Sequence, residues 1–325
     1  MGGTPPIGTH LPTLLKVKGV LDKRLVYVTG KGGVGKTTVA AALGLAAARA
    51  GKRTVICEVA EQERISEAFG HGATGFNETE VADNLHAFSI DPEKAKKEWL
   101  HHQLRSETLA GLLGQSSIFQ LLTAAAPGLA ELLTMGKIWE LAQLQRRTAK
   151  AAPYDLVIVD APATGHGLAL LRAPRTFADI ARVGPIRHHA QTIHSFTTDA
   201  AVTGVVAVAL AEEMPVNETI DLEERLTADM GMRLSGVLVN GVMPQRFSGA
   251  QANAMAAAEG AGSPAAREAL TAALRAHQRT LCQRSQVARL KRGVQAPVST
   301  LPFVLTPEMA LEDLESLSVE LERKL

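Results

Sequence analysis

The chain has 325 residues, of which 46% are hydrophobic and 21% are charged, a composition typical of a soluble globular protein that excludes global disorder. Its 34 Lys and Arg residues nearly balance 33 Asp and Glu residues, and the net charge of +1 gives no general attraction to nucleic acid or to an anionic membrane.

The predicted elements begin after a segment, residues 1–22, that has no charged stretch followed by a long apolar run. It does not predict a secretory signal, and we expect a flexible N-terminal arm. The predicted strands are residues 25–29, 53–59, 86–91, 155–160, 204–210, 234–240 and 298–301. Several are continuous Val, Ile and Leu runs, typical of parallel strands that are covered on both faces. Their alternation with helical patterns predicts a doubly wound α/β fold with a mostly parallel sheet, as one domain over residues 23–325.

Two stretches interrupt the alternation of strands and helices. Residues 93–150 carry apolar side chains at helical spacing, which predicts a helical insertion whose apolar residues pack in a core rather than form a client groove. Within it, residues 108–130 are uncharged but are interrupted by polar residues and Pro127, which favours a buried or partner-facing helix over a membrane span. Residues 250–292 are Ala-rich and predict a helical segment with a break near 260–264. Its arginines spread around the helix, so we expect a solvated face and no nucleic-acid partner.

The segment GKGGVGKT, residues 30–37, lies between a predicted strand and a predicted helix and fits the pattern G-x-x-x-x-G-K-[ST]. Its glycines let successive backbone N–H groups converge on a phosphate, and the following helix presents its positive end to the same anion. Lys36 is expected to contact the β- and γ-phosphates, and Thr37 to ligate Mg²⁺. The predicted nucleotide-binding residues of this segment are Gly30, Lys31, Gly32, Gly33, Val34, Gly35, Lys36, Thr37 and Thr38.

With its additional lysine, Lys31, this loop resembles the deviant Walker A motif of the SIMIBI-class P-loop ATPases. A second segment, DAPATGH at residues 160–166, follows an apolar strand and is similar to the D-T-A-P-T-G-H signature of the ArsA-type family within that class. That family includes the arsenite-pump ATPases and the tail-anchored-protein targeting ATPase. Weaker similarities lie at residues 65–70, 127–132, 213–219 and 301–308, and at Asn240.

The resemblance implies a P-loop NTPase fold and the cofactors ATP and Mg²⁺. Asp160 would hold Mg²⁺ together with Thr37, Asn240 would contact the adenine, and Pro302 would also bind the nucleotide. Lys31 would act on the partner's nucleotide across a dimer, as an arginine finger does. The resemblance thus implies a homodimer, or a heterodimer with a paralogous ATPase, whose hydrolysis of ATP drives conformational change for an unidentified protein client.

The predicted switch I departs from the family pattern. An ungapped alignment places Ala60 where the family has the aspartate that positions the attacking water. A neighbouring carboxylate could take this role, and strand alternation puts Glu58 on the same face as Ala60. We therefore expect Glu58 first, and Glu61 second, to be the catalytic carboxylate.

The cysteines also depart from the family pattern. Cys57 and Cys282 supply neither a cysteine cluster for As(III) nor a C-x-x-C pair for zinc, so arsenite is not expected to stimulate the protein. So few cysteines fit a reducing compartment, and we expect a cytoplasmic protein.

Two alternatives remain open. Because of Ala60, the chain could be the weakly hydrolysing, nucleotide-binding half of a heterodimer. A partition or septum-positioning ATPase acting on DNA or membrane would share GKGGVGKTT, but residues 311–325 are acidic and do not predict a basic membrane-docking helix. Membrane contact is therefore expected to be peripheral at most.

Overall fold

The computed structural model describes residues 19–59, 63–104, 128–147, 151–181, 184–258, 260, 262–306 and 309–324. Within them an eight-stranded sheet has the order β3-β4-β2-β5-β1-β6-β7-β8. The strands are β1 (Leu25–Gly30), β2 (Thr54–Val59), β3 (Thr79–Ala82), β4 (Leu85–Ile90), β5 (Leu156–Asp160), β6 (Thr203–Leu210), β7 (Gly236–Val242) and β8 (Val298–Pro302). All neighbouring strands are parallel except β3, which is antiparallel to β4. The predicted mostly parallel α/β fold is therefore confirmed.

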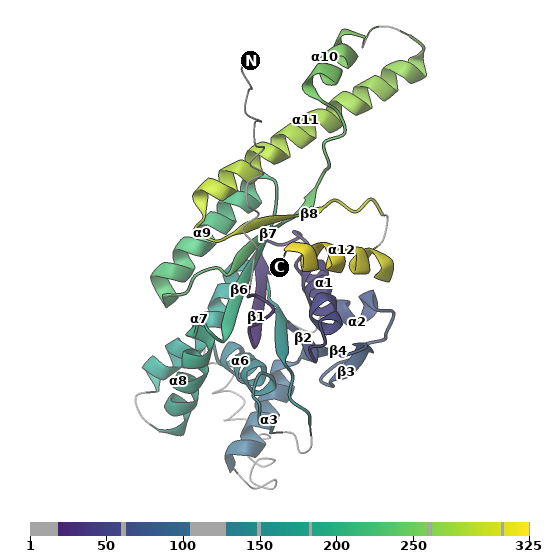
Figure 1. Cartoon of the computed structure of the whole chain (residues 1–325). Helices are drawn as coiled ribbons and strands as arrows, with labels where there is room; N and C mark the ends of the chain where they lie inside the picture. The colour runs from purple at the N-terminus through teal and green to yellow at the C-terminus, as the bar shows by residue number, and fades with distance from the viewer. Residues whose placement is uncertain are drawn as a thin grey trace, which may run out of the picture.

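Helices cover both faces of this sheet (Figure 1). They are α1 (Lys36–Arg49), α2 (Arg64–Ala68), α3 (Pro92–Leu104), α6 (Leu129–Leu141), α7 (Thr164–Ile180), α8 (Pro185–Thr198), α9 (Glu213–Met230), α10 (Gly249–Ala257), α11 (Pro264–Gly293) and α12 (Leu311–Lys324). Helices α1 and α12 lie on one face, and α6, α7 and α9 lie on the other. The sheet is thus covered on both sides, as the apolar strands require.

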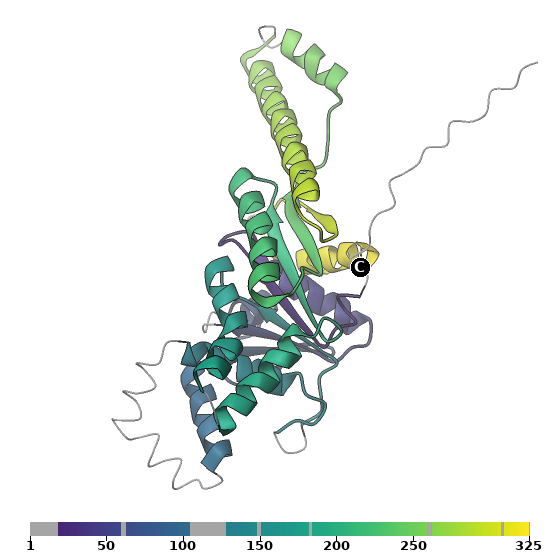
Figure 2. The ribbon, with the colours of Figure 1, turned by 90° about the vertical axis from the view of Figure 1, so that its left-hand side faces the viewer.

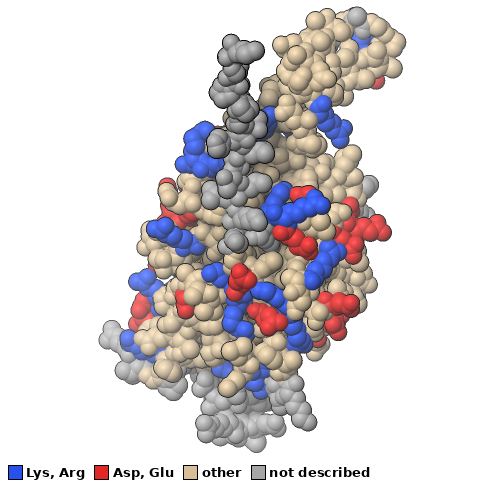
Figure 3. Space-filling model, viewed as in Figure 1, with Lys and Arg blue, Asp and Glu red and all other residues tan. Residues whose placement is uncertain are grey.

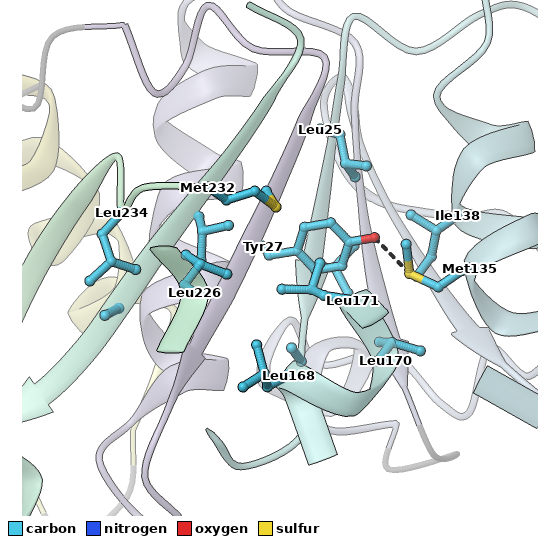
Figure 4. Close-up of a cluster of buried hydrophobic side chains, with 14 of the residues drawn as sticks. Leu25, Tyr27, Met135, Ile138, Leu168, Leu170, Leu171, Leu226, Met232 and Leu234 are labelled. Carbon is cyan, nitrogen blue, oxygen red and sulfur yellow. Dashed lines mark hydrogen bonds between the residues drawn. The ribbon is translucent and has the colours of Figure 1, made fainter. Parts of the chain in front are cut away.

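Two hydrophobic cores result, one on each face of the sheet, and strand β1 contributes to both. Leu25 and Tyr27 point into the core under α6, α7 and α9, whereas Val26 and Val28 point into the core under α1 and α12. This follows from the two-residue period of a strand. Figure 4 shows Tyr27 among leucines of the first core, with its hydroxyl donating to the sulfur of Met135 on α6 over 2.9 Å.

The sequence missed strand β3 and misplaced the beginning of the packed chain. β3 is a short edge strand of mixed polarity with no continuous apolar run, so its pattern is weak. Within the predicted arm, Val20 is 2% exposed and packs in the core under α1 and α12. The end of the range 1–22 therefore belongs to the packed part of the protein.

Helices α10 and α11 form an arm that projects from the sheet, as Figures 1 and 2 show from two sides. Only the C-terminal part of α11 lies beside the body, where α11 packs against α9. Figure 3 shows positive and negative side chains interspersed over the visible body and a mostly uncharged surface at the end of the arm. None of the described helices is long and apolar enough to cross a membrane.

The order of the strands also sets where a ligand can bind. From β1 the chain passes through α1 to β2, yet β5 lies between these two strands in the sheet, and β6 lies on the other side of β1. In open parallel sheets the crevice for a ligand lies beyond the carboxyl ends of strands at such a switch in direction. Residues 30–37 lie at this position, after the end of β1.

Candidate nucleotide site

The loop after β1 has the backbone conformation that its glycines predict. Gly33 and Gly35 have φ angles of 82° and 88°, a left-handed conformation that L side chains rarely adopt. A side chain at Gly30 would collide with the carbonyl oxygen of Val208 on β6, and one at Gly35 with the amide of Asn240 on β7. The glycines therefore allow both the curl of the loop and its close approach to neighbouring strands.

At the start of α1, two predicted residues face the end of β5. The Thr37 hydroxyl donates to Asp160 Oδ2 over 2.6 Å, and Lys36 Nζ donates to the carbonyl oxygen of Lys31 over 3.1 Å, closing the loop over itself. Burial lowers the pKa of Lys36 and raises that of Asp160 from their usual values. Both line a cavity of about 530 Å³, together with glycines of the loop and residues 160–163.

Three buried oxygens at the carboxyl ends of adjacent strands lack a hydrogen-bond partner within the described structure: Thr29 Oγ1, Glu58 Oε2 and Asp160 Oδ1. Buried polar atoms rarely remain unpaired. A hydroxyl and a carboxylate are hard oxygen donors of the kind that Mg²⁺ prefers. Thr37 and the unpaired oxygen of Asp160 therefore fit a bound Mg²⁺ ion.

Glu58 lies beside Asp160, because the two residues are register partners in the parallel pair of β2 and β5. Its Oε1 accepts a hydrogen bond from the backbone N–H of Arg64 over 2.7 Å, at the start of α2. Burial is the main cause that raises the pKa of Glu58 to about 7, and the nearby Asp160 adds to it while backbone donors oppose it. Glu58 is 1% exposed and is not among the residues that line the cavity. The expected catalytic carboxylate thus lies below the cavity wall and does not face the cavity.

Lys31 makes an ion pair within its own chain. Its Nζ lies 2.5 Å from Glu218 Oε1 on α9, and the side chains of both are about one third exposed. The other oxygen of Glu218 accepts from the Thr164 hydroxyl over 3.3 Å, at the first residue of α7. Glu218 therefore connects the loop lysine to the helix that follows β5.

A second cavity, of about 240 Å³, lies on the other side of the loop. It contains Asn240, which was expected to contact adenine, and Pro302, which was expected to bind the nucleotide, and it shares Gly33, Gly35, Thr38 and Met309 with the first cavity. Asn240 Nδ2 donates to the carbonyl oxygen of Val34 over 3.1 Å. This bond leaves the Asn240 side-chain oxygen as the group that can accept from a ligand.

Sequence reasoning missed several residues of this second cavity. Arg279 and Gln283 on α11 line it, as does Met309 after β8. These residues are far apart in sequence and belong to no short motif, so only the folded chain brings them together.

Other predicted residues lie elsewhere. Ala60 and Glu61 fall outside the described residues. His166 is exposed on the first turn of α7. Cys57 is buried in β2 and Cys282 is exposed on α11, and the described part of the chain contains no cluster of His, Cys, Asp and Glu that could hold a metal ion.

A family model for anion-transporting ATPases matches residues 23–187, just over half of the chain. The chain belongs to this ArsA-type family. ATPase BagA of Mycobacterium tuberculosis is 33% identical over 233 residues, covering 68% of this chain and 66% of the relative. ATPase GET3 of Candida glabrata is 28% identical over 258 residues, covering 68% and 73% of the two chains. GET3 of Podospora anserina is 28% identical over 164 residues, covering 50% and 46%.

The match to the ArsA-type family includes the loop after β1 and the residues after β5 that line the first cavity. The second cavity draws mainly on residues between 210 and 317, all of which lie beyond the matched range. The chain spans just under two thirds of the length of the mycobacterial relatives that it matches. Family membership thus bears most directly on the loop after β1 and the first cavity.

Proposed function

We propose that this ArsA-type protein binds and hydrolyses ATP with Mg²⁺, in a dimer that couples hydrolysis to conformational change for a protein client. The observation that carries the proposal is the contact of Thr37 with Asp160 at one wall of the first cavity, below the glycine loop. The second cavity lies on the other side of the same loop and offers Asn240 to a base. The two cavities fit the phosphates and the base of one nucleotide.

In this proposal, backbone N–H groups of the loop and the N-terminus of α1 bind the phosphates, and Lys36 neutralises the charge on the γ-phosphate. Bound Mg²⁺, held by Thr37 and Asp160, supplies further neutralisation of the phosphate oxygens. Glu58 is the candidate to orient a water, since its carboxyl group lies beside Asp160 and has a raised pKa. To do so, Glu58 has to exchange its bond with the Arg64 backbone for one with water.

Titration calorimetry with ATP and Mg²⁺, followed by a phosphate-release assay, tests this function. The wild type is expected to bind ATP and to release phosphate only when Mg²⁺ is present. Absence of ATP binding in properly folded protein would refute the proposal.

Lys31 is proposed to act on the nucleotide of the partner subunit. Its present ion pair with Glu218 has to break first, and both side chains are exposed enough for such a change. Mixing two inactive variants tests the role in trans. Lys31→Ala subunits bind nucleotide but lack the lysine, whereas Lys36→Ala subunits keep Lys31 but lose the nucleotide. If Lys31 acts in trans, the mixture recovers roughly a quarter of the wild-type rate, because half of the dimers are mixed and one site in each works. No recovery in subunits that exchange freely would show that Lys31 acts in its own chain.

A second candidate function is that of a weakly hydrolysing half of a heterodimer with a paralogous ATPase. The bond between Glu58 and the Arg64 backbone favours it, since this carboxylate is engaged below the cavity wall. If this second function is right, the purified chain should release phosphate slowly, and the complex recovered from native cells should release it faster. Equal rates per site in both preparations would argue against a heterodimer.

A membrane-docking partition ATPase is disfavoured by the packing of α12. Its apolar residues Leu314, Leu317 and Leu321 are buried against α1 and are not available to a lipid surface. We propose a cytoplasmic protein whose client is another protein rather than DNA. Mass spectrometry of proteins that co-purify in the presence of ATP would identify the client class.

A further inference from the structure

Helix α11 forms one side of the second cavity and is fixed there by Gln283. This side chain is 8% exposed. Its Nε2 donates to the carbonyl oxygen of Gly241 over 3.1 Å, and its Oε1 accepts from the backbone N–H of Met243 over 2.9 Å. Both backbone groups lie just after Asn240, so Gln283 ties α11 to the chain segment that presents the base-binding asparagine.

Arg279 lies one helical turn before Gln283 and therefore on the same face of α11. It lines the second cavity together with Asn240 and Pro302. Of the residues that the structure describes around this cavity, Arg279 alone carries a positive charge.

The other arginines on this part of α11 bind to the protein itself. Arg284 donates to Gln245, and Arg289 donates to Asn217. Within the described chain, Arg279 has neither a hydrogen bond nor an ion pair. Its guanidinium is therefore free to contact a ligand in the cavity, whereas those of Arg284 and Arg289 are engaged.

We propose that Arg279 binds the nucleobase through the plane of its guanidinium group. A guanidinium is planar and weakly hydrated, and it stacks on aromatic faces. The cavity also offers apolar surfaces from Pro302, Phe303 and Leu210, beside which the ring of a base can lie. This inference rests on the proposed function, because it takes the second cavity as the place of the ATP base. It adds a base-binding residue that lies on the projecting arm and outside every motif of the sequence.

Calorimetry with two probes tests the proposal: ATP, and inorganic tripolyphosphate, which carries the phosphates but no base. Arg279→Ala is expected to weaken ATP binding about tenfold, which corresponds to ~1.4 kcal/mol, and to leave tripolyphosphate binding unchanged. Arg279→Lys keeps the charge but loses the plane, and we expect it to bind ATP as weakly as the alanine variant. Arg275→Ala is the matched control, because Arg275 is an exposed arginine one turn closer to the start of α11 and lines neither cavity. This variant should bind both probes as the wild type does.

Several results would overturn the inference. Wild-type ATP affinity in Arg279→Ala would show that the residue does not touch the base. An equal loss of affinity for ATP and for tripolyphosphate would show that Arg279 contacts the phosphates. Wild-type ATP affinity in Arg279→Lys would show that the charge of this side chain, and not its planar group, makes the contact. If the wild type bound neither probe, the proposed function itself would fail, a result distinct from a defect confined to Arg279→Ala.

Discussion

The two sides of the candidate nucleotide site differ in how complete they are. On the phosphate side, Thr29, Glu58 and Asp160 each keep a buried oxygen without a partner among the described residues. On the base side, the Asn240 amide nitrogen and both polar groups of Gln283 are hydrogen-bonded within the protein.

We infer from this difference where a bound nucleotide would change the protein. An unpaired buried oxygen costs free energy, so the phosphate side is stabilised when a metal ion, water or proton supplies the missing partner. The base side keeps its own hydrogen bonds and is preorganised. We therefore expect substitutions on the phosphate side to alter turnover, metal dependence and stability as well as affinity, and substitutions on the base side to alter affinity and selectivity alone.

The largest expected effect is on turnover. Glu58→Gln is expected to lower the rate by about 10²- to 10⁴-fold, the usual loss for a proton-handling or water-positioning group, with ATP affinity nearly unchanged. Because the pKa of Glu58 is raised to about 7, the wild-type rate should rise from pH 6 to pH 8 as the carboxyl ionises, and the variant should lack this rise. Phosphate-release rates across this range provide the measurement.

Controls for this prediction are at hand. Glu67→Gln alters an exposed glutamate of α2 and should leave the rate unchanged, and Glu61→Gln tests the second candidate carboxylate. If Glu58→Gln and Glu61→Gln both hydrolyse ATP at the wild-type rate, neither glutamate is catalytic.

The second prediction concerns affinity on the phosphate side. Lys36→Ala removes a charged donor to two phosphates, and we expect ATP affinity to fall by about 10²- to 10³-fold. Calorimetry measures this change, with the exposed Lys291→Ala on α11 as a control for the loss of one positive charge. An unchanged ATP affinity in Lys36→Ala would show that the loop after β1 does not bind the phosphates.

The third prediction tests selectivity on the base side. Because Asn240 Nδ2 is bonded to Val34, its free oxygen suits the exocyclic amine of adenine and opposes the O6 of guanine. Asn240→Ala is expected to weaken ATP about tenfold and to narrow the preference for ATP over GTP. Competition binding of both nucleotides gives the ratio, and Asn217→Ala on α9 is a matched control. If the ratio of ATP affinity to GTP affinity were the same in Asn240→Ala and in the wild type, Asn240 would not contact the base.

The smallest expected effect is on stability without nucleotide. The pKa of Glu58 is higher in the folded chain than its usual value of 4.5, so its contribution to stability is full below pH 4.5 and is lost as the pH rises through about 7. The neutral amide of Glu58→Gln avoids this loss. The variant is therefore expected to melt a few degrees above the wild type at pH 8 and to lose this advantage at pH 5. Thermal melts at pH 8 and pH 5 test this prediction. A higher melting temperature of the variant at pH 5 alone would contradict a raised pKa of Glu58.

The sequence predicted the parallel sheet and the phosphate side because their signals are local. Lys36 and Thr37 are adjacent in one motif, and Asp160 ends an apolar run that reads clearly as a buried strand. The base side depends on Asn240, Pro302, Gln283 and Arg279, which come from separate elements. No local pattern says that one turn of α11 lies beside the end of β7. The conformation of the Glu58 side chain could not be predicted from the sequence either, since its hydrogen bond with the Arg64 backbone depends on where α2 begins.

The attachment of α11 at Gln283 has a mechanical consequence. At about 1.5 Å of rise per residue, the helix extends about 28 Å from Gln283 to its first residue, Pro264. A rotation of about 10° about this anchor would displace the far end by about 5 Å, a lever action that enlarges a small rearrangement at the nucleotide. A spin label or fluorophore at the exposed Ser263 would then report nucleotide occupancy from outside the site.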